Sequence, residues 1–426
     1  MLNKLKSLAF NKELYWTVLF QFSSLVGGVV LMKLLAVSLT TAEYGLYAII
    51  TSIVAFVLMM PFTALLQGVS RYVSIYKKKG KEGEFITSVI VLIQMCITAY
   101  ILVGMLVYLF YPLSVEWSNK FFLVLLLAIS EVFKIMFRAI NNANRERKNI
   151  AISVFVEFAS KITLVFIIHM STSLNINDVL IAFVIANILS VIIMLNKNRD
   201  SISRSNFSRK YFDIHTLRTL TFSYPLILWG GFGWLRDMSN RWYLDYFLGK
   251  EEVALFTMIA SLALIIPLAL QGVIGSFFIP IIYQKENDKK GVAERFLKLV
   301  IPILATVFLI GFIILYFIKD FIVVLFTDEK YLTISWMLPW MFLAYSFYVL
   351  SMVATYELLS DKQTKKLLLS SITPGVIAFF GGYYFIKNNG LEGALYNYML
   401  TYLSYSLLTF SVVVKYNIKK KKGFLS

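Results

Sequence analysis

Charged side chains recur at helical spacing inside segments that are otherwise apolar. In one segment, Glu131, Lys134 and Arg138 follow at i, i+3 and i+7, positions that share one face of an α-helix. The next apolar segment supplies Glu157 and Lys161 at i, i+4. Amines and guanidinium groups bind phosphate, whereas carboxylates bind cations or neutralise the amines. These residue types allow three interpretations: an anion-binding surface, an ion-coupling site, or neutral pairs that hold two helices together.

A second charged stretch is WGGFGWLRDMSNRWYLDYFLG, residues 229–249. Asp237, Arg241 and Asp245 are spaced by four, so Arg241 can pair with an acid one turn to either side. Arg236 falls about 100° round the helix from Asp237, and we expect its guanidinium to be unpaired. The face that it shares carries an amide and aromatic rings, which suit sugars: Trp229, Asn240, Tyr243 and Phe247. Arg236 is therefore the predicted phosphate ligand, and the other three charges form a largely self-neutralised ladder.

Lys33 is a further cation, about 10 Å inside the outer end of the first apolar segment at 1.5 Å rise per residue. It either lines the same polar surface or extends to the outer headgroups. A charge at mid-membrane depth costs at least about 2.5 to 3.5 kcal/mol on insertion scales. Such residues are therefore expected to face a protein interior or a wet cavity.

The composition is that of an integral membrane protein. Of 426 residues, 59% are hydrophobic and 15% charged, and the mean hydropathy is +0.74. Twelve stretches have the length of about 20 mostly apolar residues that a spanning helix needs. We expect all-α spans at roughly 14–39, 43–70, 85–110, 120–143, 150–170, 177–195, 219–247, 252–283, 296–318, 332–358, 367–386 and 391–415.

The formal charge of +17 is concentrated in alternate loops. Lys and Arg gather in YKKKGKEGE, NRERK, QKENDKK, SDKQTKK and the tail KYNIKKKKG, whereas the intervening loops hold almost none. By the positive-inside rule this pattern predicts that both termini are cytoplasmic. The charge is thus a topology signal that suits an anionic inner leaflet, and we predict no nucleic-acid partner.

A metal or cofactor site is not predicted. Cys96 is the only cysteine, and His169 and His215 lie far apart without a carboxylate at ligand spacing.

The chain divides into two similar halves. AEYGLYAIITSIVAF near the second span is matched by KEEVALFTMIASLAL near the eighth, with Glu43 on Glu252 and Ser52 on Ser261 at one offset of 209. Both copies run in the same direction, as in parallel transporter repeats. We predict a six-helix lobe at 1–195, a cytoplasmic linker at 196–218, a second lobe at 219–415 and a basic tail at 416–426.

The predicted interior charges are confined to the first lobe and the seventh span, where six cations face four carboxylates. The later spans are apolar apart from Glu357, near the inner surface. Such a divided surface suits an amphiphile with an anionic head and a long lipid tail.

The stretch AEYGLYAIITSIVAFVLMMPFTALLQGVSRYVSIY resembles polysaccharide-export flippases, the Wzx-type branch of the multidrug/oligosaccharidyl-lipid/polysaccharide (MOP) exporter superfamily. The seventh and eighth spans are similar too, with YP at entry, LGKEEVALF at the outer turn and Pro280 towards the end. The resemblance covers the whole chain and implies a V-shaped, MATE-like pair of six-helix lobes in a prokaryotic cytoplasmic membrane.

The resemblance implies that the substrate is an undecaprenyl-pyrophosphate-linked oligosaccharide, flipped from the inner to the outer leaflet by alternating access. The partners it implies are membrane lipids and polysaccharide polymerase or assembly proteins. The cationic cavity of the family would be carried here by Arg236, Arg241, Lys134, Arg138, Lys161 and Lys33.

Two other functions stay open on the sequence. A proton- or sodium-coupled exporter of small molecules would use Glu131, Glu157, Asp237 or Asp245 as its ion site. A polysaccharide polymerase or ligase would need a large extracytoplasmic loop, and no outer loop is predicted to exceed about 12 residues. We therefore expect a transporter and not an enzyme.

Overall fold

The structure, a computed structural model, describes residues 12–112, 114–203, 209–275, 292–360, 363, 366 and 368–421. Within these ranges the chain is α-helical apart from short connections, turns and two brief helices of other types. Two compact units are present. Unit 1 comprises residues 1–39 and 50–231, and unit 2 comprises residues 40–49 and 232–426.

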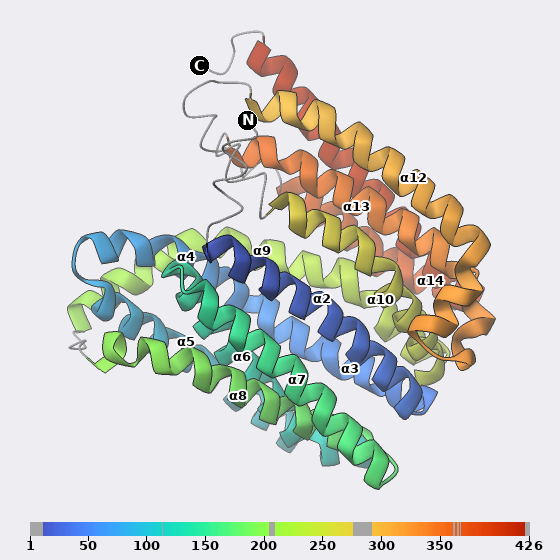
Figure 1. The fold of residues 1–426 in the computed structure, drawn as a ribbon, viewed down its shortest axis with the longest axis horizontal. Coiled ribbons are helices and arrows are strands. Elements are labelled where there is room, and N and C mark those ends of the chain that lie inside the picture. Colours follow the sequence, from blue (N-terminus) through green and yellow to red (C-terminus); the bar gives the residue numbers. More distant parts are fainter. Residues whose placement is uncertain are drawn as a thin grey trace. The chain divides into compact units, whose positions relative to one another are not determined.

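Unit 1 is built from long antiparallel helices (Figure 1). Helix α2 packs along α7, while α6 and α7 both pack along α8. The bounds of its helices are α2 (Lys12–Ser38), the second part of α3 (Thr41–Val57), the π-helix η1 (Leu58–Phe62), α4 (Thr63–Lys78), α5 (Glu82–Phe110), α6 (Val115–Ala143), α7 (Arg147–Ser171), α8 (Ile176–Ser203) and the first part of α9 (Arg209–Phe247).

Unit 2 contains the start of α3, the second part of α9, α10 (Lys250–Val273), α12 (Val292–Phe326), the 3-10 helix η3 (Glu329–Ile334), α13 (Met337–Ser360) and α14 (Leu368–Lys421). Helix α13 packs against α10, α12 and α14. Helix α14 bends at Gly390, whose φ of 57° and ψ of −132° are not helical. Glycine tolerates this backbone because it has no Cβ.

The predicted linker at 196–218 is largely helical. Helix α8 continues to Ser203, and α9 begins at Arg209; residues 204–208 lie outside the described ranges. The compact units divide inside α9, at residue 231, and residues 40–49 belong to unit 2. The lobe boundaries drawn from hydropathy stay a prediction about membrane topology.

Nine helices of the described residues are long and apolar enough to cross a membrane. The chain is therefore an all-α, multi-pass membrane protein. The count excludes α6 and α9, whose charged and polar residues lower their apolar character, and it treats both arms of α14 as one helix. Twelve spans and cytoplasmic termini stay predictions.

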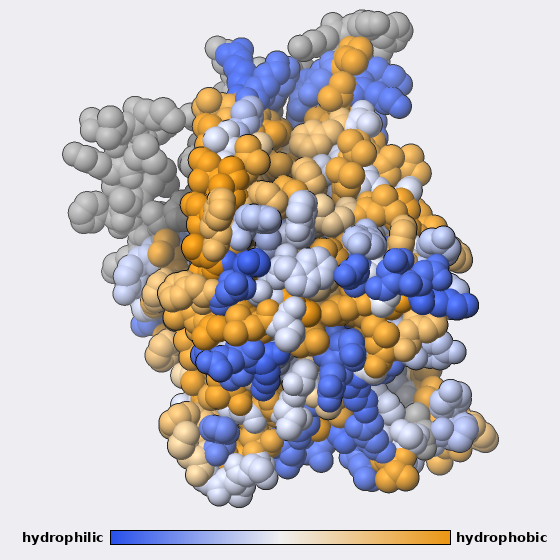
Figure 2. All heavy atoms as spheres, turned by 90° about the vertical axis from the view of Figure 1, so that its right-hand side faces the viewer, coloured by the Kyte–Doolittle hydropathy of each residue, from blue (hydrophilic) through white to orange (hydrophobic). Residues whose placement is uncertain are grey.

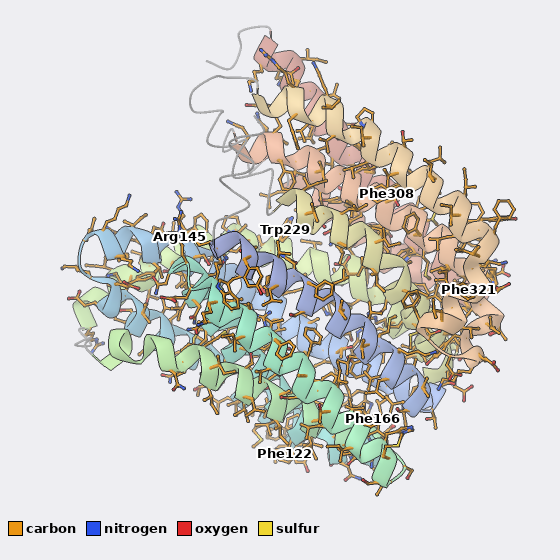
Figure 3. The ribbon with its side chains drawn as sticks, viewed as in Figure 1. Phe122, Arg145, Phe166, Trp229, Phe308 and Phe321 are labelled. Carbon is orange, nitrogen blue, oxygen red and sulfur yellow. The ribbon has the colours of Figure 1, made fainter. Side chains whose placement is uncertain are left out.

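Apolar side chains cover the outside of these helices, as a lipid environment requires. Hydrophobic residues extend over much of the face in Figure 2, and hydrophilic ones gather in separate patches. Phe166 on α7 and Phe321 on α12 are 49% and 65% exposed (Figure 3). Phe308, by contrast, is 2% exposed and packs on Phe342 of α13.

Two glycines bring α9 against η1 inside unit 1. A Cβ on Gly230 would lie 2.6 Å from the carbonyl oxygen of Met59, and one on Gly231 would lie 2.8 Å from the sulfur of Met60. Any larger residue would therefore push the two helices apart. This close packing fixes the end of the unit 1 part of α9 against η1.

Candidate functional site

The first group of charges forms one connected cluster inside unit 1. Helix α6 supplies Glu131, Lys134 and Arg138, and α7 supplies Glu157 and Lys161. We call these five residues, together with Asn187 of α8, the charged network. Because i, i+3 and i+7 positions share a helix face, α6 presents its three charges to the same neighbours. The sequence prediction that these residues act on one surface is consistent with this arrangement.

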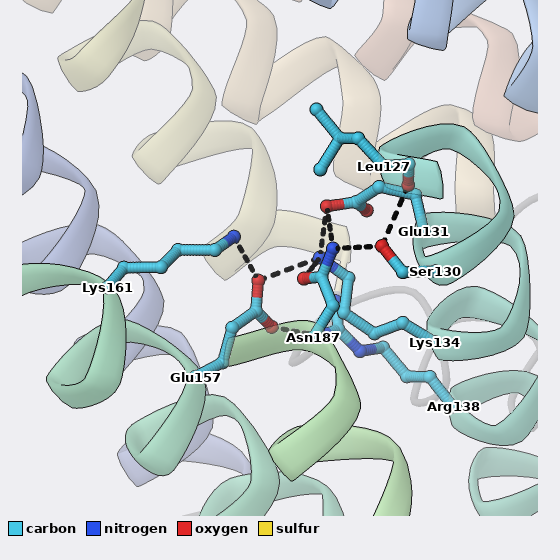
Figure 4. Close-up of polar contacts among 8 residues, drawn as sticks. All are labelled: Leu127, Ser130, Glu131, Lys134, Arg138, Glu157, Lys161 and Asn187. Atoms are coloured by element: carbon cyan, nitrogen blue, oxygen red, sulfur yellow. Dashed lines mark hydrogen bonds and ion pairs between the residues drawn. The ribbon is translucent and has the colours of Figure 1, made fainter. Parts of the chain in front are cut away.

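Glu157 is the centre of the charged network (Figure 4). Its Oε1 accepts from Lys134 Nζ and from Lys161 Nζ, each at 2.7 Å. Its Oε2 accepts from the Nη2 of Arg138 at 3.0 Å. One carboxylate therefore holds three cations from two helices, rather than the single partner that the i, i+4 spacing predicts.

Asn187 closes the charged network on α8. Lys134 Nζ donates to Asn187 Oδ1 at 2.9 Å and to Glu131 Oε1 at 2.7 Å. Asn187 Nδ2 donates to Glu131 Oε1 and to Ser130 Oγ, both at 3.0 Å. The sequence analysis missed Asn187. The available signal was an asparagine in the middle of an apolar segment, since a polar group at that depth needs a hydrogen-bond partner.

The charged network is deeply buried except at one edge. Lys134, Glu157 and Lys161 are 4 to 6% exposed. The side chain of Arg138 is 30% exposed, and its Nε has no hydrogen-bond partner among the described residues. Three cations stand against two carboxylates, a formal surplus of one positive charge. The network can therefore bind an anion where Arg138 is accessible.

The second group of charges lies in unit 2, and there the expectation of an unpaired guanidinium at Arg236 was wrong, while its role as a phosphate ligand stays a prediction. Arg236 is ion-paired: its Nε donates to Asp237 Oδ1 at 2.7 Å and its Nη2 to Asp237 Oδ2 at 2.8 Å. The angle between neighbouring Cβ atoms does not separate these groups, because the arginine side chain is long enough to turn back to its neighbour. The planar guanidinium then matches both carboxylate oxygens.

Tyrosine rings enclose this pair. The guanidinium carbon of Arg236 lies 4.9 Å from the ring centre of Tyr348, 5.3 Å from that of Tyr405 and 5.9 Å from that of Tyr402. The Tyr402 hydroxyl donates to Asp237 Oδ1 at 2.9 Å. Cation–π contacts and this hydrogen bond stabilise the buried ions. We call Tyr348, Tyr402 and Tyr405 the tyrosine cage.

The sequence analysis missed the tyrosine cage because it counted the later spans as apolar. The signal was present: Tyr398, Tyr402 and Tyr405 follow at i, i+4 and i+7 on α14, and Tyr345 and Tyr348 at i, i+3 on α13. Those spacings place the hydroxyls on one face of each helix. Tyrosine is amphipathic, so a stripe of it marks a polar surface inside a membrane protein.

The predicted sugar-binding face of α9 is packed against α14. Asn240 donates to the carbonyl oxygen of Ala394 at 3.2 Å and accepts from Asn397 Nδ2 at 2.6 Å. Tyr243 contacts the rings of Phe379 and Tyr383. Both side chains thus stabilise helix packing in this structure.

The remaining predicted site residues are placed separately. Arg241 donates to the carbonyl oxygen of Ala48 at 3.1 Å, within unit 2. Asp245 on α9, Lys33 on α2 and Trp229 on the unit 1 part of α9 are each half-buried. Their roles in substrate binding stay predictions. Among the described residues, no group of histidine, cysteine, aspartate and glutamate could hold a metal ion.

The comparisons with known proteins concern both the family and the fold. A family model described as polysaccharide biosynthesis protein matches residues 10–286, more than half of the chain. No curated protein matches the sequence. Among solved structures, 24 chains match.

The matched structures have the same fold at low sequence identity. An inward-facing multidrug resistance MATE family transporter of the MOP superfamily matches with a TM-score of 0.69 and 12% identity, over 94% of this chain and 95% of that chain. The lipid II flippase MurJ, in an inward closed conformation, matches with a TM-score of 0.70 and 17% identity, over 94% of this chain and 87% of that chain. A Vibrio cholerae MATE transporter, VcmN, matches with a TM-score of 0.66 and 14% identity, over 95% of this chain and 95% of that chain.

The family match agrees with the resemblance drawn from the sequence, and the structural matches agree with the all-α fold that this resemblance implies. The resemblance to polysaccharide-export flippases is confirmed: the chain belongs to the polysaccharide biosynthesis protein family and has the fold of the MOP exporter superfamily.

Proposed function

We propose that this protein flips undecaprenyl-pyrophosphate-linked oligosaccharides from the inner to the outer leaflet of a prokaryotic cytoplasmic membrane. The product would feed surface polysaccharide synthesis, in concert with polymerase or assembly proteins. We further propose twelve spans, cytoplasmic termini and alternating access. Membership of the polysaccharide biosynthesis protein family supports the class of substrate, and the charged network carries the assignment of the binding site.

The surplus positive charge of the charged network is the observation that favours an anionic substrate. Buried cations beyond the number of buried carboxylates are costly unless an anion compensates them. Arg138 is the accessible member, because its side chain is 30% exposed, although its Nε is buried and has no hydrogen-bond partner in the described chain. A diphosphate group can accept from Arg138 while Glu157 keeps Lys134 and Lys161 in place.

Arg236 is not proposed as the first phosphate ligand, unlike in the sequence prediction. Its guanidinium is already matched by Asp237, so a phosphate could bind it only by competing with that carboxylate. We propose that Arg236 and Arg241 give unit 2 its internal structure first and contact substrate only in another conformation. Lys33, Trp229, Asn240 and Tyr243 remain secondary candidates, and Asp237, Asp245, Glu131 and Glu157 are proposed to pair helices.

Export of surface polysaccharide tests the proposal. In cells that depend on this protein, Arg138→Gln is expected to lower export about tenfold or more, because it removes about 1.4 kcal/mol or more of charge-assisted binding. Unflipped lipid-linked units should then accumulate. Arg138→Lys keeps the positive charge but loses the planar pair of N–H donors. Its export should therefore lie between that of the wild type and that of Arg138→Gln.

The protein level and membrane insertion of each variant are measured in the same cells. Normal export by Arg138→Gln at normal protein level would contradict the proposed site. Export that fails while lipid-linked units are flipped and remain unpolymerised would instead favour a polymerase. Drug resistance on overexpression, with export unaffected, would favour a small-molecule exporter.

A further inference from the structure

A separate cavity lies wholly within unit 2, where α12 begins and α13 and α14 end. Its volume is about 300 Å³, at the lower end of the range for small-molecule sites. Helix α12 contributes its first turns, α13 its last turn and α14 the stretch before Lys421. The proposed translocation uses none of these residues.

The walls of the cavity are apolar. They are formed by Leu297, Ile301, Pro302, Ala354, Phe410 and Val413. Beneath them Ala354, Leu358, Val413 and Tyr416 form a small hydrophobic core. An alkyl chain or glycerol backbone could occupy such a surface, whereas a free inorganic ion would gain nothing from it.

One end of the cavity is lined by hydrogen-bond acceptors. Glu357 is 2% exposed, and its Oε2 accepts from Asn417 Nδ2 at 3.0 Å. The oxygen of the same amide, Asn417 Oδ1, is buried and has no hydrogen-bond partner in the described part of the chain. Glu294 adds a second carboxylate to the lining. A buried acceptor that lacks a donor is costly, so this end suits a ligand with several N–H donors.

The lining of the cavity also contains one exposed cation. Lys298 pairs with Glu294 at 2.8 Å, and its side chain is 65% exposed. An ammonium at the acceptors and a phosphate at Lys298 would therefore both be matched. The neighbouring residues Leu299 and Ile303 are exposed apolar side chains on α12, which suits contact with lipid tails.

We propose that this cavity binds a phospholipid with a primary ammonium headgroup, of the phosphatidylethanolamine type. Its ammonium donates to Glu357 and Asn417, its phosphate meets Lys298, and the start of one acyl chain lies along Ile301 and Phe410. Each of the three parts of the ligand is matched by a different part of the cavity. The same alkylammonium chemistry could come from a free cationic amphiphile, and the test separates these sources.

Native mass spectrometry of the full-length protein in detergent provides the test. Phosphatidylethanolamine, phosphatidylcholine and phosphatidylglycerol with identical acyl chains are titrated separately. Phosphatidylcholine keeps the positive charge but has no N–H donor, and phosphatidylglycerol has no ammonium. The expected result is that phosphatidylethanolamine binds about tenfold more tightly than either, as charge-assisted hydrogen bonds would give.

Variants locate the binding. Glu357→Gln should reduce the affinity for phosphatidylethanolamine about fivefold or more and leave phosphatidylcholine unchanged. Glu251→Gln, an exposed glutamate on α10, is the matched control. Because Glu357 is buried, Lys298→Gln provides a second variant on an exposed position, and it should weaken both zwitterionic lipids. Val413→Phe should fill the cavity and remove the preference.

Equal affinities for the three lipids would overturn the proposal, as would unchanged selectivity in both Glu357→Gln and Val413→Phe. Dodecylammonium is the probe for a free amphiphile. Binding of dodecylammonium that depends on Glu357, with no phosphatidylethanolamine preference, would overturn the lipid assignment.

Discussion

The two units stabilise the charged side chains in their interiors by different interactions. In unit 1, Glu157 holds Lys134, Arg138 and Lys161, and amides and hydroxyls complete the cluster. In unit 2, Arg236 and Asp237 neutralise each other inside the tyrosine cage.

The comparison teaches that a cation at mid-membrane depth is not by itself a ligand site. The pair in unit 2 is electrically complete, whereas the charged network keeps one positive charge in excess and exposes part of Arg138. We therefore propose the charged network, and not the Arg236–Asp237 pair, as the anion-binding site. The following changes test that difference, from the largest expected effect to the smallest.

Glu157→Gln should be the most damaging change. It leaves three clustered cations with only Glu131 as an acidic partner, and breaking buried ion pairs in this way costs about 3 to 5 kcal/mol. Equilibrium unfolding in mixed detergent micelles measures the loss, with Glu251→Gln as the exposed control. If both variants unfolded alike, Glu157 would not be the centre of the network.

The pair in unit 2 should show strong coupling in a double-mutant cycle. Arg236→Gln leaves the partly exposed Asp237 without its cation, and Asp237→Asn leaves the buried Arg236 without its carboxylate. Each change should cost about 2 to 3 kcal/mol. The double variant should cost less than the sum by about 1 to 3 kcal/mol, since it removes both ions. Additive costs in the unfolding measurement would show that the pair contributes nothing as a pair.

A smaller effect is expected from the tyrosine hydroxyls. Tyr402→Phe keeps the ring but removes the bond to Asp237, which should cost about 1 to 2 kcal/mol because the acceptor is charged. Tyr405→Phe is the matched control, because its hydroxyl donates to the uncharged sulfur of Met352, at 3.2 Å, and not to a carboxylate. Equal stabilities of the two variants in the same unfolding assay would argue against a structural role for the hydroxyl of Tyr402.

The smallest expected effect is a pH dependence of stability that is confined to unit 1. Both histidines of the chain, the side chains that ordinarily titrate near neutral pH, lie in that unit. His215 precedes the predicted seventh span, is 2% exposed, and lies 3.1 Å from Ser88 Oγ. Burial lowers the pKa of His215, and Glu84 opposes that shift. The lowered pKa means that the unfolded chain binds the proton more readily.

The stabilisation by neutral His215 is therefore complete above about pH 6.5, its unfolded pKa, and falls as pH drops below that value. His215→Gln should flatten this dependence. Hydrogen exchange of α4 and α5, followed between pH 7 and pH 5, measures it while α13 serves as the internal reference. If the pH dependence of exchange in His215→Gln had the same slope as in the wild type, His215 would be excluded as its cause.

Helix type, membrane class and the five charged members of the charged network were predictable from sequence. Apolar runs of spanning length indicate helices, and Glu131, Lys134 and Arg138 share a helix face whatever their partners are. The partners were not predictable, because Asn187 is 30 residues from Glu157 in sequence and only the packing of α8 brings it near.

The error at Arg236 has a different origin. Helical angles locate Cβ atoms, but a long guanidinium side chain takes the nearest carboxylate that it can reach, here the adjacent Asp237. The tyrosine cage was missed because hydropathy treats Tyr402 as part of an apolar run, although its hydroxyl binds an ion.

Binding of undecaprenyl pyrophosphate to the purified protein tests the central claim most directly, with undecaprenol as the ligand that lacks phosphate. We predict that Arg138→Gln weakens binding of the pyrophosphate about tenfold or more, leaves undecaprenol binding unchanged, and does not alter thermal stability by more than about 1 kcal/mol. Arg236→Gln should weaken pyrophosphate binding less, after its loss of stability is taken into account. Unchanged pyrophosphate affinity in Arg138→Gln, with a large loss in Arg236→Gln, would contradict the assignment of the anion site to the charged network of unit 1.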